Sequence, residues 1–423
     1  MTKSAKIHRF GKMLAGFAAI AAAIAVCAPS PGASSEHFVI TNNNYFKAEN
    51  SGTILKLGGT RANPTLTPTQ TLETGITTDG ALNFPSLQIA HAHGQACIFL
   101  GNAEAAGNAI SAFKFPGLQL VGNYSDPNLT GFTVGFSMAS HGTSLYVSLM
   151  SGPGNDHIYV IDSWQINDDC SLSLLHSTSL GDWIYSLGIT PDGRTVIGVY
   201  ADEGGTADSF SVGAGGILTE LGPFGSDLST GPGGGIDITA DGDYVFFTLA
   251  TYDGDGETEL EAFAVNSNGT LGTQQVLGGD GQLGPGPGTG GWLRLSPDER
   301  FLFVDTYGDA TDTRKRPDYD FVNQVTTLNF SENPFGLTYS GCLTTLKVPQ
   351  GDKSMLDGGM ATVEPSGAGG GLYVSEYDNS STIGLLSINS TTGCTTETAG
   401  SPYLVTSQGG LLQSVLAWPP RPF

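Results

Sequence analysis

The chain has 423 residues, and its 40 Asp and Glu against 17 Lys and Arg give a formal net charge of −23 at pH 7. A field of this sign repels phosphate backbones and anionic membrane surfaces, which excludes nucleic acid and lipid headgroups as expected partners. The 61 glycines, 22 prolines and 13% charged residues are typical of many short strands joined by tight turns. Helical patterns are nearly absent after residue 35, so the composition favours an all-β fold.

The first segment has the order of an export signal. Basic residues lie within 3–12, an apolar run of 14 residues follows over 13–26, and small residues come next. This run is shorter than the roughly 20 residues that span a bilayer. We therefore expect a cleaved signal peptide over 1–35 and a mature chain over 36–423, exported to the periplasm or secreted, with no membrane span. A second interpretation stays open, in which Cys27 is acylated and the protein is a lipoprotein.

The first two predicted strands cover residues 37–42 and 53–57. They are typical of the second and third strands of a four-stranded unit, but no first strand precedes them. At the other end of the chain, residues 411–419 are typical of a first strand with its turn, but no second strand follows them. Pairing of this segment with 37–42 would complete the unit and remove its open sheet edges.

Between these ends, a tight turn recurs ahead of an apolar strand. The copies lie at residues 93–94, 140–142, 190–194, 240–243, 296–299 and 364–367. The clearest copy is Ser296-Pro297-Asp298-Glu299, in which the proline starts the turn and residues 301–304 run apolar as a buried strand does. The copies are 48 to 68 residues apart, a spacing that suits a four-stranded propeller blade with some long loops.

Six repeats and the unit formed by the two ends make seven. The sequence therefore predicts an all-β, seven-bladed β-propeller of four-stranded blades over 36–423, closed by pairing of the N- and C-terminal segments. We expect a monomer. A β-sandwich pair and a parallel β-helix are the alternatives, and both fit the long repeat and the complementary ends less well.

Four cysteines lie outside the signal segment, and four allow three pairings. An oxidising compartment permits disulfides. Cys342 and Cys394 fall at matching places in successive repeats, so we favour a disulfide between them. Cys97 lies in an apolar strand, where we expect a buried free thiol.

The last repeat resembles that of a known family. Residues 372–383, 387–389, 392–394 and 400–403, together with the proline-containing turns, are similar to the repeat of the seven-bladed lactonase family. That family includes the propeller type of 6-phosphogluconolactonase, fungal carboxymuconate cyclases and exported bacterial members, and quinoprotein-like propellers share the repeat. The resemblance covers essentially the whole mature chain. It implies a catalytic site at the central channel built from histidine, arginine and glutamate.

Only part of that catalytic set has a match here. Glu376, in Tyr373-Val374-Ser375-Glu376, is the residue that resembles the family's Tyr-Val-x-x-Glu-type motif, with one intervening residue in place of two, and it would act as the base that activates water. Arg294, predicted on an innermost strand, would hold the developing oxyanion, and His91 would shuttle a proton. The sequence departs from the family where Gly290-Gly291-Trp292 replaces the usual Arg-His placement. Each residue also has a structural interpretation: Glu376 as an acid on a loop, Arg294 as part of an ion pair that fills the channel, and His91 as an imidazole of the core.

A second pattern repeats around the ring. The second strands of four consecutive blades end in tyrosines beside carboxylates, on loops that should share one face. The candidate binding residues are Tyr200, Asp202, Tyr252, Asp253, Tyr307 and Tyr377. Aromatic planes beside carboxylates bind sugars or cations. Inheritance of a tyrosine with the repeat explains the pattern equally well.

One acidic loop has the alternation of a calcium site. Asp253, Asp255 and Glu257 place oxygens at every second position, although the loop lacks the central glycine and final glutamate of an EF-hand. A structural Ca²⁺ and a merely solvated loop are both consistent with it. No other cofactor is required by the sequence.

Two functions follow. The first is a binding or scaffold propeller that holds a small molecule, a glycan or a protein on one loop-rich face. The alternative is a lactone hydrolase that uses Glu376 and Arg294 at the central channel. These motifs do not decide whether the chain is an enzyme.

Overall fold

A computed structural model describes residues 37–44, 49–60, 63–78, 87–104, 108–152, 157–200, 206–225, 233–250, 258–277, 289–308, 322–347, 360–362, 371–375, 381–405 and 411–418. All of them belong to the compact unit Glu36–Phe423. Within these ranges, no helix has the length and apolar character needed to cross a membrane.

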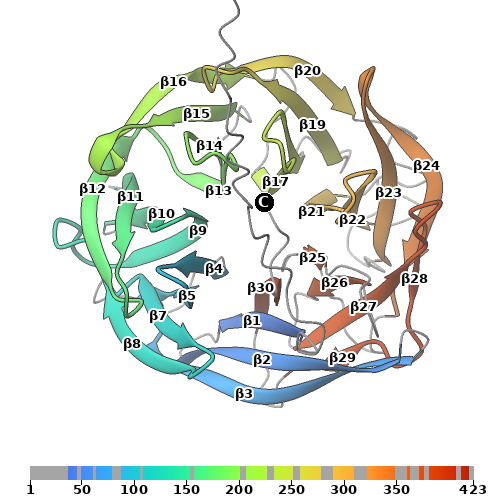
Figure 1. The fold of residues 1–423 in the computed structure, drawn as a ribbon, viewed down its shortest axis with the longest axis horizontal. Coiled ribbons are helices and arrows are strands. Elements are labelled where there is room, and N and C mark those ends of the chain that lie inside the picture. Colours follow the sequence, from blue (N-terminus) through green and yellow to red (C-terminus); the bar gives the residue numbers. More distant parts are fainter. Residues whose placement is uncertain are drawn as a thin grey trace, which may run out of the picture. The chain divides into compact units, whose positions relative to one another are not determined.

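Seven antiparallel sheets form a ring, and each sheet is one blade (Figure 1). Blade 1 contains, from the inside outwards, β30 (Leu411–Trp418), β1 (Phe38–Asn44), β2 (Glu49–Thr60) and β3 (Asn63–Thr77). Blade 2 contains β4 (Leu87–Ala92), β5 (Gln95–Gly101), β7 (Ile110–Phe115) and β8 (Gln119–Tyr124). Blade 3 contains β9 (Thr133–His141), β10 (Ser144–Ser151), β11 (Ile158–Ile166) and β12 (Leu172–Leu180), with β6 (Ala103–Glu104) beside β9.

The remaining four blades repeat this order. Blade 4 contains β13 (Ile184–Ile189), β14 (Thr195–Tyr200), β15 (Thr206–Val212) and β16 (Leu218–Gly225), with the short helix η1 (Ala214–Gly216) between the last two. Blade 5 contains β17 (Gly233–Ile238), β18 (Tyr244–Ala250), β19 (Thr258–Val265) and β20 (Leu271–Leu277). Blade 6 contains β21 (Thr289–Leu295), β22 (Phe301–Gly308), β23 (Val322–Glu332) and β24 (Phe335–Thr345). Blade 7 contains β25 (Met360–Thr362), β26 (Gly371–Ser375), β27 (Thr382–Ile388) and β28 (Thr395–Glu397), and β29 (Tyr403–Leu404) also pairs with β27.

The two ends of the chain close the ring, as predicted. β30 supplies the inner strand of blade 1 and pairs antiparallel with β1, from Phe38 opposite Trp418 to Asn44 opposite Leu411. The prediction of a seven-bladed propeller with four-stranded blades is thereby confirmed, and the sandwich and β-helix alternatives are excluded. The closure pairs a sheet edge that would otherwise be open.

The predicted turns have a common hydrogen-bond pattern that explains their sequence. In blades 4, 5 and 6, a hydroxyl donates at 2.7 Å to the Asp two residues further on; the pairs are Thr190–Asp192, Thr239–Asp241 and Ser296–Asp298. The next position takes a left-handed backbone, with φ 71° at Gly193 and 57° at Glu299, which is why glycine prevails there. The predicted turn at 364–367 lies outside the described residues.

The core lies between the blades. The second strands are buried on both faces by neighbouring blades and therefore read as continuous apolar runs. The largest side chains that are fully buried include Phe99, Tyr146, Phe246, Phe303 and Tyr373, each on the second strand of its blade. This arrangement is why the apolar strands that follow the turns were the most visible signal in the sequence.

The turn between the third and fourth strands packs on the preceding blade. Ser163 of blade 3 donates to the carbonyl of Gly216 in blade 4 at 2.7 Å. Thr327 of blade 6 likewise donates to the carbonyl of Gly393 in blade 7 at 3.3 Å. These contacts fix adjacent blades to each other at their outer edges.

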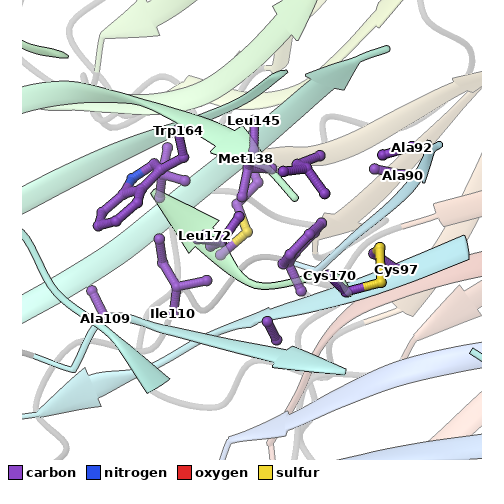
Figure 2. Packing of buried hydrophobic residues seen from close by; sticks show 14 of the residues in the cluster. Ala90, Ala92, Cys97, Ala109, Ile110, Met138, Leu145, Trp164, Cys170 and Leu172 are labelled. Carbon is purple, nitrogen blue, oxygen red and sulfur yellow. A yellow bond between two sulfur atoms is a disulfide. The ribbon is translucent and has the colours of Figure 1, made fainter. Parts of the chain in front are cut away.

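Two disulfides join adjacent blades at such turns. Cys97 of β5 is bonded to Cys170, which ends the turn before β12, inside a buried apolar cluster that includes Trp164 and Leu172 (Figure 2). The expectation of a free thiol at Cys97 is therefore wrong, because the turn of blade 3 brings Cys170 against β5. Sequence spacing alone did not reveal this contact.

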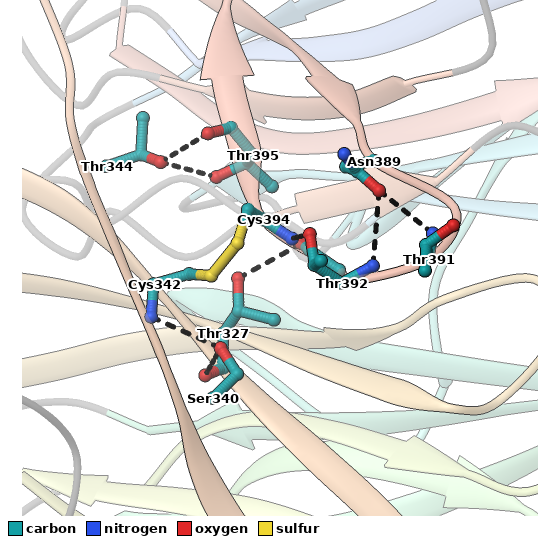
Figure 3. Close-up of a disulfide and its surroundings, with 10 residues drawn as sticks. Thr327, Ser340, Cys342, Thr344, Asn389, Thr391, Thr392, Cys394 and Thr395 are labelled. Atoms are coloured by element: carbon teal, nitrogen blue, oxygen red, sulfur yellow. Dashed lines mark hydrogen bonds between the residues drawn. A yellow bond between two sulfur atoms is a disulfide. The ribbon is translucent and has the colours of Figure 1, made fainter.

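The second disulfide joins Cys342 to Cys394 (Figure 3). The spacing had suggested that the two cysteines occupy matching places in their blades, but they do not. Cys342 lies within β24 of blade 6, whereas Cys394 follows the turn after β27 of blade 7. Beside the bond, Thr344 accepts a hydrogen bond from the hydroxyl of Thr395 at 2.7 Å and donates to its carbonyl at 2.8 Å. Blades 6 and 7 are thus linked by a covalent bond and by hydrogen bonds.

Candidate functional site

The two ends of the ring differ in the connections that they carry. We call loop face the end at which second strands finish and inner strands begin, as at Tyr200 and Ile184 of blade 4. We call turn face the opposite end, which carries the turns from inner to second strands, such as 190–195. Ligand sites of propellers are built from the loops of one face or from the inner strands, so each predicted residue is placed in these terms.

Arg294 lies on the inner strand β21, as predicted, near the turn face. Its Nη1 is 3.7 Å from Oδ1 of Asp237 on the neighbouring inner strand β17. Asp237 is buried and also accepts a hydrogen bond from the backbone N–H of Leu295 at 2.8 Å. This carboxylate therefore links the inner strands of blades 5 and 6, and Arg294 balances part of its charge.

His91 also lies near the turn face, next to the last residue of the inner strand β4. Its ring stacks on Trp418 of blade 1, with 4.7 Å between ring centroids. Burial lowers the pKa of His91, so the imidazole is neutral at pH 7. This neutral ring packs against the strand that closes the propeller.

Most other predicted site residues lie outside the described residues. They are Glu376, Asp202, Tyr252, Asp253, Asp255, Glu257 and Tyr377. For Tyr307, the structure describes only the backbone, which pairs with Thr289 and Asn323 in blade 6. β26 ends at Ser375 on the loop face, whereas Arg294 and His91 lie near the turn face. The part of the chain that the structure describes contains no cluster of three or more His, Cys, Asp or Glu side chains suited to a metal ion.

Tyr200 is held by a buried carboxylate. Its hydroxyl donates to Oδ2 of Asp208 at 2.7 Å, and its ring packs against the apolar cluster between blades 3 and 4. Burial, followed by the bond to Asp208, raises the pKa of Tyr200, so the phenol stays protonated and acts as a donor. Burial also raises the pKa of Asp208, and the hydrogen bond from Tyr200 opposes that shift. This tyrosine therefore has a structural partner in addition to its place on the loop face.

The loop face of blades 3 and 4 carries an aromatic group that we name the aromatic surface, formed by Phe132, His157, Tyr159 and Trp183. Each is partly exposed. Phe132, Tyr159 and Trp183 pack on the same small apolar cluster, which contains Met150. The His157 and Tyr159 rings lie 6.1 Å apart.

A carboxylate adjoins this surface. Asp182 precedes Trp183, and its Oδ1 accepts a hydrogen bond from the Trp183 backbone N–H at 2.7 Å, which orients the loop. Trp183 in turn meets Tyr185 edge to face, with 6.3 Å between centroids. Flat apolar rings beside a carboxylate can stack on a ligand's ring and accept hydrogen bonds from its polar groups.

Sequence reasoning missed this surface. The prediction followed the ends of second strands, whereas Phe132 and Trp183 stand just before inner strands and His157 just before a third strand. The signal that could have found them is an aromatic residue directly before an inner strand in two consecutive repeats.

Comparison with known proteins supports the fold. No protein-family model matches the chain, and no curated protein matches it either. Among solved structures, a candidate 6-phosphogluconolactonase of Bacteroides fragilis matches with a TM-score of 0.62 and 15% identity, covering 92% of this chain and 99% of that one. A candidate 6-phosphogluconolactonase of Bacteroides uniformis matches with a TM-score of 0.62 and 13% identity, covering 90% of this chain and 99% of that one. The periplasmic gluconolactonase of Pseudomonas aeruginosa matches with a TM-score of 0.56 and 16% identity, covering 87% of this chain and 98% of that one.

These identities are low, so the likeness establishes the fold. The chain shares its propeller fold with these three proteins. Activity does not follow from a shared propeller, because one fold hosts many functions.

Proposed function

We propose that this chain is an exported propeller that binds a ring-bearing ligand, a glycan or a comparable small molecule, on the loop face of blades 3 and 4. The observation that carries this proposal is the aromatic surface: Phe132, Tyr159 and Trp183 gather there, partly exposed, beside the carboxylate of Asp182. Sugar rings present apolar faces that stack on aromatic side chains and hydroxyl groups that donate to carboxylates. Export is supported by the order of charges and apolar residues within 1–35.

The test is a binding experiment with an oligosaccharide panel, read by calorimetry. The wild-type chain should bind at least one member saturably. Trp183→Ala should weaken that affinity roughly tenfold or more, because a stacked aromatic side chain is a typical hot spot. Trp183→Phe should retain most of the affinity.

A matched control comes from another exposed apolar residue. Ile217 is 48% exposed at the turn before β16, away from the aromatic surface, and Ile217→Ala should bind as the wild type does. Wild-type affinity in Trp183→Ala, or no saturable binding to any oligosaccharide in the panel, would refute the proposal.

A second candidate function is lactone hydrolysis. It is favoured by the match to the Pseudomonas aeruginosa gluconolactonase, whereas Arg294 lies near the turn face and β26 ends on the loop face. Hydrolysis of a panel of sugar lactones by the wild-type chain, lost in both Glu376→Gln and Arg294→Gln, would establish it. Hydrolysis that persists in these variants would assign the reaction to other residues.

A further inference from the structure

Two consecutive blades bury an acidic residue at the same position of the third strand. Asp162 of β11 lies opposite Val147 of β10, and Asp208 of β15 lies opposite Gly198 of β14. Val147 and Gly198 are equivalent, because each is the fourth residue of the second strand of its blade, counted from Ser144 of β10 and Thr195 of β14. The side chains are 0% and 5% exposed, so both carboxylates are removed from water.

The connection that enters each of these blades carries a further acid. Asp126 raises the pKa of Asp162, and Asp182 lies near enough to the Tyr200–Asp208 pair to raise the pKa of Tyr200. Asp126 and Asp182 occupy the same place, since each is the second residue after the outer strand of the preceding blade, β8 or β12. The two boundaries share these positions but differ in contacts, because Asp162 has Asp126 as its acidic neighbour whereas Asp208 has Glu220.

The two boundaries differ in whether a hydrogen-bond donor reaches the buried carboxylate. In blade 4, the hydroxyl of Tyr200 donates to Asp208. The equivalent position in blade 3 is Leu149, which has no polar atom to offer. Both carboxylate oxygens of Asp162 are buried without a hydrogen-bond partner, and so is Oδ2 of Asp126.

The polar surroundings of Asp162 supply no positive charge. Its polar neighbours are the hydroxyl of Ser177, directly across the strand pair, and the carboxyl of Asp126. Among the described ion pairs, none involves either acid. Two carboxyl groups confined together in a buried site require a cation or a shared proton, because isolated buried charge is strongly unfavourable.

We propose that Asp126 and Asp162, with the hydroxyl of Ser177, bind a divalent calcium ion at the boundary of blades 2 and 3. Calcium takes oxygen ligands from carboxylates, hydroxyls, backbone carbonyls and water in flexible geometry, and it neutralises two carboxylates at once. The ion would link the strand β11 to the connection after β8. This site is separate from the acidic loop of Asp253, Asp255 and Glu257.

The test uses the purified full chain, first stripped with EGTA and then titrated with CaCl₂. Extracellular calcium modules have a Kd of about 10⁻⁴ to 10⁻³ M. At 10 mM CaCl₂, the thermal unfolding midpoint of the wild type should therefore rise by roughly 2–5 °C. Calorimetry should show calcium binding that Asp162→Asn removes, together with the rise in midpoint.

Two further variants make the result specific. Asp208→Asn changes the equivalent acid that already has the Tyr200 hydroxyl, and it should keep the full calcium response. Asp253→Asn tests the acidic loop and should also keep it. A calcium response that survives in Asp162→Asn, or that is lost in Asp253→Asn instead, would overturn the proposal.

The alternative to a calcium ion is a proton shared between Asp126 and Asp162. If 10 mM CaCl₂ leaves the unfolding midpoint of the folded wild type unchanged between pH 5 and 8, the two acids hold a proton and the calcium proposal fails.

Discussion

Removal of the disulfide between Cys97 and Cys170 should lower the free energy of unfolding by about 4 kcal/mol. The two cysteines are 73 residues apart in sequence, so the bond closes a long loop in the unfolded chain. The chain-entropy relation for a loop of this length gives about 4 kcal/mol at 25 °C. The bond also holds blade 2 to blade 3 within the buried cluster of Figure 2, so its loss acts at a blade boundary.

The assay is urea unfolding of the wild type and of the double variant Cys97→Ala/Cys170→Ala, followed by tryptophan fluorescence. The double variant Cys342→Ala/Cys394→Ala is the matched control, because its sequence separation of 52 predicts a similar loss of about 4 kcal/mol. A loss below about 1 kcal/mol for Cys97→Ala/Cys170→Ala would refute the entropic reasoning.

Burial adds a kinetic difference between the two bonds. Cys97 and Cys170 are fully buried, whereas Cys342 and Cys394 are partly exposed. A thiolate must reach the sulfur that it attacks, so a mild reductant should open Cys342–Cys394 first. Mass spectrometry of trapped thiols would test the order, and labelling of Cys97 before Cys342 would contradict it.

Three further outcomes are expected. Tyr200→Phe removes the donor to the buried Asp208 and should cost about 1–3 kcal/mol of unfolding free energy in a urea titration; an unchanged midpoint would contradict the bond. Gly393→Ala should cost about 2–4 kcal/mol, because Gly393 has φ +71° and a Cβ there would lie 2.3 Å from the Phe301 ring; a fully stable variant would contradict the close packing. In EGTA, stability should fall by about 1.4 kcal/mol per pH unit as pH rises from about 4 towards 8, because folded Asp162, with its pKa of about 8, keeps a proton that the unfolded chain releases. Asp162→Asn should remove that slope in pH-dependent unfolding curves, and an equal slope in the variant would contradict the assignment.

The repeat made the fold predictable from sequence. The turns of blades 4, 5 and 6 are visible because each needs a hydroxyl, an Asp and a left-handed residue at fixed places, as the bond of Ser296 to Asp298 shows. The apolar strands after them are visible because neighbouring blades bury both of their faces. The closure was predictable for the same reason, since residues 37–42 and 411–418 each lacked a partner that the other supplies.

The site was predictable only in part. Arg294 was assigned correctly to an inner strand. The contacts of Arg294 with Asp237 and of His91 with Trp418 join different blades and leave no trace in local sequence. The aromatic surface combines Phe132, from the start of one blade, with Trp183, from the start of the next. Side chains brought together in this way are far apart along the chain.

The sequence by itself therefore determined the class of fold, the number of blades and the way in which the ring closes, because these depend on local periodicity and on unpaired ends. Only the tertiary structure decided which side chains meet between blades. It paired Cys97 with Cys170, placed Tyr200 on Asp208 and left both carboxylate oxygens of Asp162 buried without a hydrogen-bond partner. The physical reason is that each contact lies across a blade boundary, where docking of one blade on the next sets the geometry and the repeat within each blade does not encode it.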